Sequence, residues 1–179
     1  MIERHLTREE LEAGLESIRQ SPKDAGALEL IVRRPYPGGR DLIDTAQLDP
    51  TAGLVGDSWA TRVDSPDPDT QVNVMNARVI ALIAQSKDRW PLAGDQLFVD
   101  LDLADENLPP GSRLEIGTAI IEVSAEPHTG CGKFVQRFGV EAMKFVNSPV
   151  GRRLRLRGLN ARVVKAGQIR VGDLARKRT

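Results

Sequence analysis

The sequence has a single cysteine, only two histidines and few aromatic residues among its 179 positions. One cysteine cannot form an intramolecular disulfide, which fits a reducing compartment. Two histidines and one cysteine cannot supply the three or four nitrogen and sulfur ligands of an ordinary zinc site. Aromatic residues make up 4% of the chain and do not alternate with basic residues, as they do where bases stack. We therefore do not expect nucleic acid as a partner.

Long apolar runs are also missing. The longest, Val79 to Ala84, is far too short to cross a bilayer. The first seven residues carry no apolar run, so we expect neither a signal peptide nor a membrane partner, and a cytoplasmic location. No Gly-x-x-x-x-Gly-Lys-[Ser/Thr], Gly-x-Gly-x-x-Gly or Gly-x-Ser-x-Gly motif occurs. These absences argue against nucleotide hydrolysis, dinucleotide redox chemistry and hydrolase-type ester cleavage.

The net charge is zero, but the charges are unevenly distributed. Residues 41–110 hold 13 acidic and 4 basic side chains, whereas residues 149–179 hold 10 basic side chains and Asp173 as the one acid. The basic carboxy-terminal part would attract a small anionic ligand such as a phosphate. Alternatively, the two parts are complementary surfaces of one domain.

The residue pattern predicts a mainly β protein with small helices. Thr7 and Glu10 form a capping box for a helix that ends at Ser21-Pro22. Short alternating runs with glycine turns follow and predict a barrel-like β fold. We assign residues 1–24 to a helical extension and 25–179 to the barrel domain. Strands are expected at 27–34, 71–75, 97–103, 114–117, 119–123, 154–165 and 168–174. Helices are expected at 76–85 and 133–146, and residues 35–70 are expected to be mostly loop.

Cys131 has the most informative setting in the chain. Gly130 and Gly132 flank it, which lets the backbone turn tightly and leaves the sulfur approachable. His128 lies three residues before it and Lys133 two after, and a nearby cation would stabilise the reactive thiolate. His128 would then act as its base and Lys133 would hold a thiolate or a phosphate. The alternatives are a buried, purely structural cysteine, a packing histidine and a solvated lysine.

Three further polar residues interrupt or border apolar runs: Asn76, Arg78 and Asn107. Polar side chains in such places either bond to the backbone or line a pocket. We treat all three as candidate ligand contacts, with capping and turn roles as the alternative.

Several landmarks in chain order resemble the MOSC domain, the module named for the carboxy-terminal part of molybdenum-cofactor sulfurases. They are Gly53-x-x-Gly56-Asp57, Asp105-Glu106-Asn107-Leu108, the strand entry at Leu114–Gly117, Cys131, Gly158–Val163 and Gly172-Asp173. The resemblance covers roughly residues 28–175. It implies a pyruvate-kinase-like β-barrel, closed or partly open.

The resemblance also implies a function. The family's cysteine, which carries sulfur or contacts molybdenum, corresponds to Cys131, and an asparagine of the strand-entry turn corresponds to Asn107. Some relatives reduce N-hydroxylated bases or amidoximes with a molybdenum cofactor (molybdopterin). The arginines near the carboxy terminus, Arg157 and Arg162 among them, would then bind the pterin phosphate, because the planar guanidinium fork suits phosphate.

Two functional hypotheses remain at this point. In the first, Cys131 carries sulfur or binds molybdenum, and a separate pyridoxal-phosphate cysteine desulfurase or redox partner takes part. In the second, the chain is a non-catalytic module that binds a small anion or a partner, with Cys131 as a structural residue. The sequence leaves the substrate and the oligomeric state open.

Overall fold

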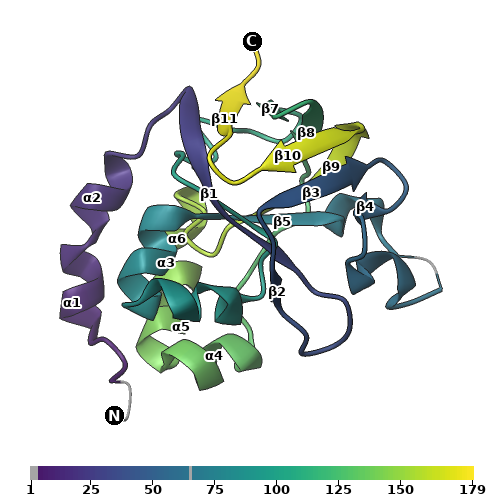
Figure 1. The fold of residues 1–179 in the computed structure, drawn as a ribbon. Helices are drawn as coiled ribbons and strands as arrows, with labels where there is room; N and C mark the ends of the chain where they lie inside the picture. The colour runs from purple at the N-terminus through teal and green to yellow at the C-terminus, as the bar shows by residue number, and fades with distance from the viewer. Residues whose placement is uncertain (1–3, 65) are drawn as a thin grey trace.

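The computed structural model describes residues 4–64 and 66–179. Within this part of the chain, seven strands close into a barrel in the order β1-β11-β7-β8-β9-β5-β6 and back to β1. All neighbours are antiparallel except β5 and β6. A smaller sheet, β10-β3-β4, lies beside the barrel, and β2 pairs with β1. The mainly β fold with small helices and a closed barrel is therefore confirmed (Figure 1).

The strands are short, as glycine-rich turns predict. Their bounds are β1 Ala25–Arg33, β2 Asp41–Leu42, β3 Thr45–Asp49, β4 Gly53–Leu54, β5 Val72–Asn76, β6 Leu97–Val99, β7 Arg113–Ile116, β8 Ala119–Val123, β9 Leu159–Lys165, β10 Gly167–Arg170 and β11 Leu174–Lys177. The barrel is filled by aliphatic side chains from alternate positions of these strands, including Leu28, Val74, Leu114, Ile121 and Ala161.

The α-helices gather on one side of the barrel (Figure 1). Their bounds are α1 Arg8–Ala13, α2 Leu15–Arg19, α3 Ala77–Ala84, α4 Gly132–Phe138, α5 Val140–Asn147 and α6 Pro149–Arg153, with 3₁₀ helices η1 Ser58–Thr61, η2 Pro68–Thr70 and η3 Lys87–Ala93. A second apolar core joins them to the outside of the barrel and contains the aromatic rings of Trp90, Phe98, Phe134, Phe138 and Phe145.

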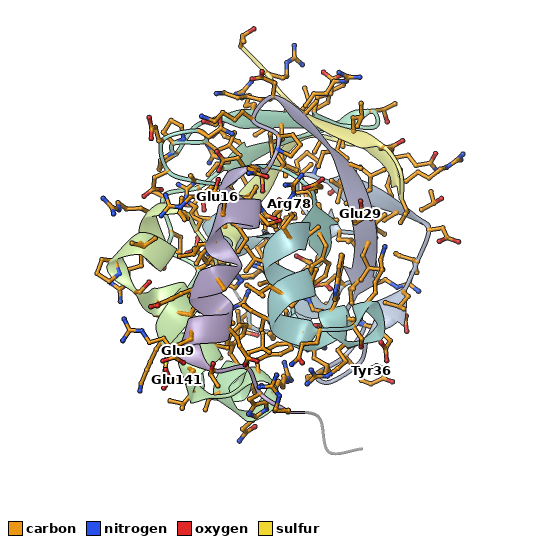
Figure 2. The ribbon with its side chains drawn as sticks, turned by 90° about the vertical axis from the view of Figure 1, so that its left-hand side faces the viewer. Glu9, Glu16, Glu29, Tyr36, Arg78 and Glu141 are labelled. Atoms are coloured by element: carbon orange, nitrogen blue, oxygen red, sulfur yellow. The ribbon has the colours of Figure 1, made fainter. Side chains whose placement is uncertain are left out.

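The amino-terminal helices lie against α3 and α5. The capping box at Thr7 is present, with Glu10 bonded to the Thr7 backbone amide at 2.8 Å. Figure 2 shows Arg78 between α2 and α3, where it donates to the Ser17 carbonyl at 2.9 Å. The division of the chain at residue 24 stays a prediction, and its first three residues lie outside the described part.

Several local predictions differ from the structure. The strand expected at 97–103 ends at Val99, and the strand expected at 168–174 ends at Arg170. The single helix expected before Ser21 is divided at Gly14 into α1 and α2. The segment 35–70, expected to be mostly loop, contains β2, β3 and β4. The strand expected from residue 154 begins only at Leu159, because Leu154 caps α6 and Arg155 adopts a positive φ of 47° that breaks the extended run.

No helix in the described residues is long and apolar enough to cross a membrane.

Candidate functional site

Cys131 is an exposed thiol at the start of α4. The loop before it is fixed from α5, because Asn147 accepts a hydrogen bond from the Gly130 amide at 2.9 Å. The backbone amides of Phe134 and Lys133 face the sulfur, although the sulfur forms no regular capping hydrogen bond. The Phe134 amide above all lowers the pKa of the Cys131 thiol, and burial opposes this shift only in part. An accessible thiol with a lowered pKa is the reactive kind of cysteine.

Two arginines contribute to the same shift. The guanidinium groups of Arg157 and Arg137 lower the pKa of the Cys131 thiol further, because their positive charge favours the thiolate. Arg137 lies on α4 itself and donates to the Leu92 carbonyl at 2.6 Å. Arg157 lies in the segment between α6 and β9, and its guanidinium stands 5.2 Å from the centre of the Phe134 ring. The sulfur therefore lies in a positive environment.

Further guanidinium groups converge on the turn that contains Gly94. Arg40 donates to the Pro91 carbonyl at 3.1 Å, and Arg34 donates to the Gly94 carbonyl at 2.9 Å. A Cβ atom added to Gly94 would lie 3.8 Å from one nitrogen of Arg40 and 3.9 Å from one nitrogen of Arg137. The φ of Gly94 is +90°, a conformation that favours glycine. We call Arg34, Arg40, Arg62 and Arg137, with this glycine, the arginine cluster.

The arginine cluster carries more positive than negative charge. Burial, and then the neighbouring arginines, lower the pKa values of both Arg40 and Arg62. Asp57 is the acid that acts on the cluster, and its carboxylate is already held by Arg34 at 2.8 and 3.0 Å. Like charges gathered in a partly buried place are stabilised by an anion. The cluster is therefore suited to a phosphate or a similar group.

A buried ion network lies beneath the cysteine loop. The side chain of Asp95 is 0% exposed, and one of its oxygens accepts from Arg157 Nη1 at 2.6 Å. The other oxygen lies 2.9 Å from Nε2 of His128. Burial alone would raise the pKa of Asp95, but Arg157 and His128 reverse this and lower it. Burial, with repulsion from Arg157, lowers the pKa of His128, so the imidazole is neutral near pH 7.

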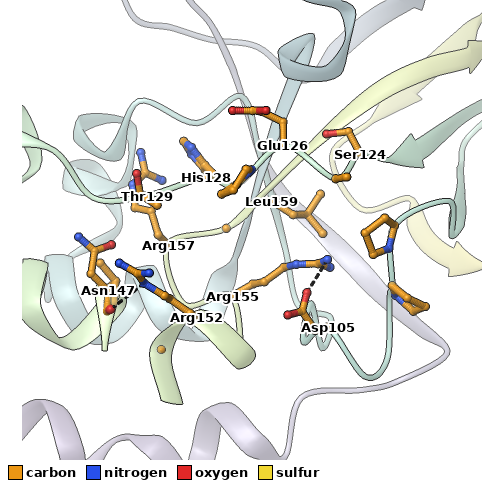
Figure 3. A pocket seen from close by; sticks show the side chains of 17 residues that line it. Asp105, Ser124, Glu126, His128, Thr129, Asn147, Arg152, Arg155, Arg157 and Leu159 are labelled. Atoms are coloured by element: carbon orange, nitrogen blue, oxygen red, sulfur yellow. Dashed lines mark hydrogen bonds and ion pairs between the residues drawn. The ribbon is translucent and has the colours of Figure 1, made fainter. Parts of the chain in front are cut away.

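A cleft of about 520 Å³ is lined in part by His128 and Arg157. Figure 3 shows the side chains that surround it, which come from the 124–129 segment, from α5 and α6, and from the segment before β9. Its walls are largely apolar, with prolines at 109, 110 and 127, and Leu159. The polar and charged groups that line it are Asp105, Ser124, Glu126, His128, Thr129, Asn147, Arg152, Arg155 and Arg157. A cleft that combines apolar walls with polar and charged groups is suited to a small molecule.

Arg155 shapes one wall of the cleft. It donates to the Leu103 and Leu108 carbonyls at 3.2 and 2.6 Å and pairs with Asp105 at 2.6 Å. Its backbone has a positive φ of 47°, which is costly for a residue with a side chain. Because these contacts hold the side chain, Arg155 joins the 103–108 segment to the segment before β9.

The structure brings together only part of the predicted site. His128 and Arg157 share Asp95 and line the cleft, whereas Cys131 caps the start of α4 and is not among the residues that line the cleft. His128 directs Nε2 to Asp95, and no hydrogen bond joins it to Cys131 in the described residues. Lys133 is exposed in the first turn of α4, where its backbone amide faces the sulfur.

The other predicted residues have structural contacts. Asn76 caps α3 and also donates to Ser21 and to the Leu101 carbonyl. Arg78 pairs with Asp100 at 2.7 Å.

Two more predicted site residues, Asn107 and Arg162, lie apart from the cleft. Asn107 donates to the Lys23 and Asp102 carbonyls. Arg162 pairs with Glu122 on the outer face of the barrel, with 48% of its side chain exposed. Neither is among the residues that line the cleft.

The arginine cluster and Asp95 are not predicted by any pattern in the sequence. Arg34 and Arg40 border a Pro-Gly turn that was interpreted only as loop, and their basic character was the available signal. Asp95 lies between Gly94 and a buried glutamine, and no local pattern distinguishes it from a surface acid. Its role is visible only where the chain folds Arg157 and His128 onto it.

The sequence was compared with family models and known proteins. The model of the MOSC domain matches residues 67–176, more than half of the chain. The chain belongs to the MOSC domain family. The resemblance inferred from the landmark residues is thereby confirmed. No curated protein matches the sequence.

Solved structures share the fold of this MOSC protein. The YuaD protein of Bacillus subtilis is 16% identical, with a TM-score of 0.61 over 84% of this chain and 94% of YuaD. YiiM from Escherichia coli is 17% identical, with a TM-score of 0.56 over 86% of this chain and 70% of YiiM. YiiM from Geobacillus stearothermophilus is 12% identical, with a TM-score of 0.55 over 88% and 74%. At these identities the likeness shows the fold alone.

Proposed function

We propose that this MOSC protein binds a molybdenum cofactor at Cys131 and takes a small substrate in the cleft beside it. The observation that carries the proposal is the combination of an exposed thiol of lowered pKa with the guanidinium groups of Arg40 and Arg137, which bond backbone carbonyls and form no ion pair within the described residues. A thiolate is a ligand for a soft metal, and guanidinium groups suit the phosphate of a pterin.

The residues present fit such a group. The arginine cluster converges where Gly94 leaves out a side chain, so an anion could approach Arg40 and Arg137 together. Nε of Arg157 is buried and has no hydrogen-bond partner in the described residues, so the electrostatic needs of this arginine are met only in part. No group of three or more His, Cys, Asp or Glu side chains that could hold a metal occurs in the described residues. A metal here would thus take Cys131 as a single protein ligand and its other ligands from the cofactor.

When bound, the cofactor would supply a redox-active molybdenum centre, suited to the reduction of N-hydroxylated substrates. The chain itself would contribute the thiolate of Cys131, and Arg40 and Arg137 would hold the anionic end of the cofactor. The apolar walls of the cleft would exclude water from one side of the substrate. Electrons would come from a separate redox partner.

A second function is favoured by the exposure of the thiol. A sulfur carrier must meet the active site of a separate cysteine desulfurase, which a buried sulfur could not do. Cys131 is exposed and its lowered pKa makes it nucleophilic. In this function Cys131 would carry a persulfide, and the arginine cluster would stabilise the negative charge of its terminal sulfur.

The deciding experiment measures what the purified protein contains. The protein is produced in a host that makes molybdenum cofactor, and molybdenum and oxidised-pterin fluorescence are measured per mole of protein. We expect both in the wild type, loss of molybdenum in Cys131→Ser, and loss of pterin when Arg40 and Arg137 are both changed to Gln. Arg162→Gln, on the outer face of the barrel, is the matched control and should retain both.

Three results separate the alternatives. A wild-type protein without molybdenum or pterin would refute cofactor binding. Persulfide labelling at Cys131 in that protein would then support the sulfur carrier. A protein without cofactor or persulfide would support the non-catalytic binding module with a structural cysteine.

A further inference from the structure

Asp95 contacts two functional side chains at once. It belongs to the segment between η3 and β6, and its carboxylate is completely buried. One oxygen accepts from Arg157 at 2.6 Å, and the other meets Nε2 of His128 at 2.9 Å. Arg157 also donates to the Ala93 carbonyl at 2.9 Å, so its guanidinium is fixed. Such an arrangement leaves the carboxylate little freedom to turn.

The charges around His128 determine which of its nitrogens carries the proton. Asp95 is ionised, because Arg157 lies against it, so it can only accept hydrogen bonds. Nε2 of His128 must therefore carry the hydrogen and donate it to Asp95. The other charged groups that face the ring or the cleft are Arg157, Arg34, Arg152, Arg155, Asp105 and Glu126. Of these, Arg157 and Arg34 lower the pKa of His128 and so oppose a second proton on the ring.

His128 contacts Asp95 through Nε2 and also lines the cleft. Cδ2 of His128 lies close to the backbone at Gly158, since a Cβ added there would be 3.3 Å from it. Nδ1 forms no hydrogen bond with any described residue, and His128 lines the cleft. We propose that Asp95 is a positioning residue that holds His128 as the neutral Nε2–H tautomer, so that Nδ1 serves as a hydrogen-bond acceptor in the cleft.

This assignment names the chemistry that the cleft recognises. Thr129, Asn147 and Arg152 supply hydrogen-bond donors and Glu126 supplies carboxylate oxygens, whereas Nδ1 would be a neutral acceptor beside them. A ligand with an N–H or O–H group would donate to Nδ1. That this ligand is a substrate rests on the proposed function; the tautomer does not.

The chain is well suited to a direct test, because it contains only two histidines. Long-range ¹H–¹⁵N correlation spectra of the uniformly ¹⁵N-labelled protein distinguish the two neutral tautomers and the imidazolium. The variant His5→Gln assigns the signals of His128 by removing the other set. We expect a single neutral Nε2–H form at pH 7. A wild-type ring protonated on Nδ1, or a charged ring at that pH, would overturn the proposal.

The variant Asp95→Asn tests the positioning role. Arg157 requires an acceptor, so the Asn oxygen would face Arg157 and the Asn NH₂ would face His128. Nε2 would then have to accept, and the proton would move to Nδ1, as expected for an Asp-to-Asn change beside a histidine. Asp100→Asn, whose carboxylate pairs with Arg78, is the control and should leave the tautomer unchanged.

An unchanged Nε2–H tautomer in folded Asp95→Asn would contradict the role of Asp95. Circular dichroism verifies the fold of that variant, and if it does not fold, the wild-type spectrum decides the tautomer by itself. Molybdenum and pterin content of the same preparations separates this inference from the proposed function. Protein without cofactor but with the Nε2–H tautomer would refute only the function, whereas loaded protein with the reversed tautomer would refute only the inference.

Discussion

The Arg34–Asp57 ion pair supports the arginine cluster, and its removal gives the sharpest test of the site's construction. The two side chains are 8% and 0% exposed. Asp57 accepts from Nε and Nη2 of Arg34 at 3.0 and 2.8 Å, and also from the Trp59 amide at 3.0 Å. Arg34 in turn donates to the Gly94 carbonyl. We consider the variant Asp57→Asn, which keeps the size of the side chain and removes its charge.

The expected loss is large because the guanidinium stays buried without its counter-charge. Removing one partner of a buried ion pair costs about 3–5 kcal/mol, against a total stability of about 5–15 kcal/mol for a domain. With a urea m-value of about 1–3 kcal/mol per molar, the unfolding midpoint should fall by at least ~1 M. The variant should also bind less cofactor, since Arg34 holds the turn that contains Gly94.

Urea unfolding followed by circular dichroism and by tryptophan fluorescence measures this loss. The fluorescence reports on the site directly, because Asp57 bonds the backbone of Trp59. Glu12→Gln removes the exposed pair between Arg8 and Glu12 and should leave the midpoint unchanged. If Asp57→Asn unfolds at the same urea concentration as Glu12→Gln, the reasoning is refuted.

The same pair predicts a dependence on pH. Burial opposes the charged form of Asp57, but the contacts with Arg34 hold its pKa below the ordinary value of 3.8. As the pH falls, Asp57 is therefore protonated in the unfolded chain before it is protonated in the folded protein. The stability from the pair is complete above about pH 3.8 and is lost below it. Asp57→Asn should lack this step.

Three further predictions concern the site. The pKa of the Cys131 thiol should lie below that of a free cysteine, and Arg137→Gln should raise it. The rate of alkylation by iodoacetamide as a function of pH measures both pKa values. An unchanged rate profile in Arg137→Gln would contradict the role of the Arg137 charge. Gly94→Ala should lower the free energy of unfolding by about 1 kcal/mol or more, since the φ of +90° disfavours a side chain, and urea unfolding measures this loss. The variant should also contain less pterin, as measured by fluorescence. An unchanged pterin content would contradict anion binding at the arginine cluster. The pKa of His128 is below 6.5 in the folded protein, so His128 of the unfolded chain is protonated at a higher pH, and the stability should decline as the pH falls below about 6.5. His128→Gln should remove this decline in the urea midpoint. If the decline persists in the variant, a group other than His128 causes it.

Local patterns predicted the elements whose signals lie within a few residues. The capping box at Thr7 marks the first helix because both hydrogen bonds join neighbours in sequence. The strand and helix expected at 71–85 are present as β5 and α3, since alternation and helical periodicity are also local. The strand predicted from residue 154 was wrong at its start. Leucine and arginine alternate there as they would in a strand, but Arg155 has a positive φ that turns the backbone.

The candidate site was predictable only around Cys131. Its two flanking glycines and the order of the landmark motifs are features of the chain itself, and they indicate both the cysteine and the family. Asn107 and Arg162 were chosen on the same kind of signal, yet their contacts are with the backbone and with Glu122. A residue type in a suggestive place does not reveal the direction of its side chain.

The sequence by itself determined the fold class, the family and the identity of the exposed thiol, because these depend on periodicity and on motifs that are continuous in the chain. Tertiary structure alone decided which charges surround that thiol. Arg34, the adjacent Gly94 and Asp95, Arg137 and Arg157 come from four separate segments, which meet only when the barrel closes and α4 packs against η3. Electrostatic interaction acts through space and falls off with distance rather than with sequence separation. The charged environment of Cys131 is therefore a property of the closed barrel.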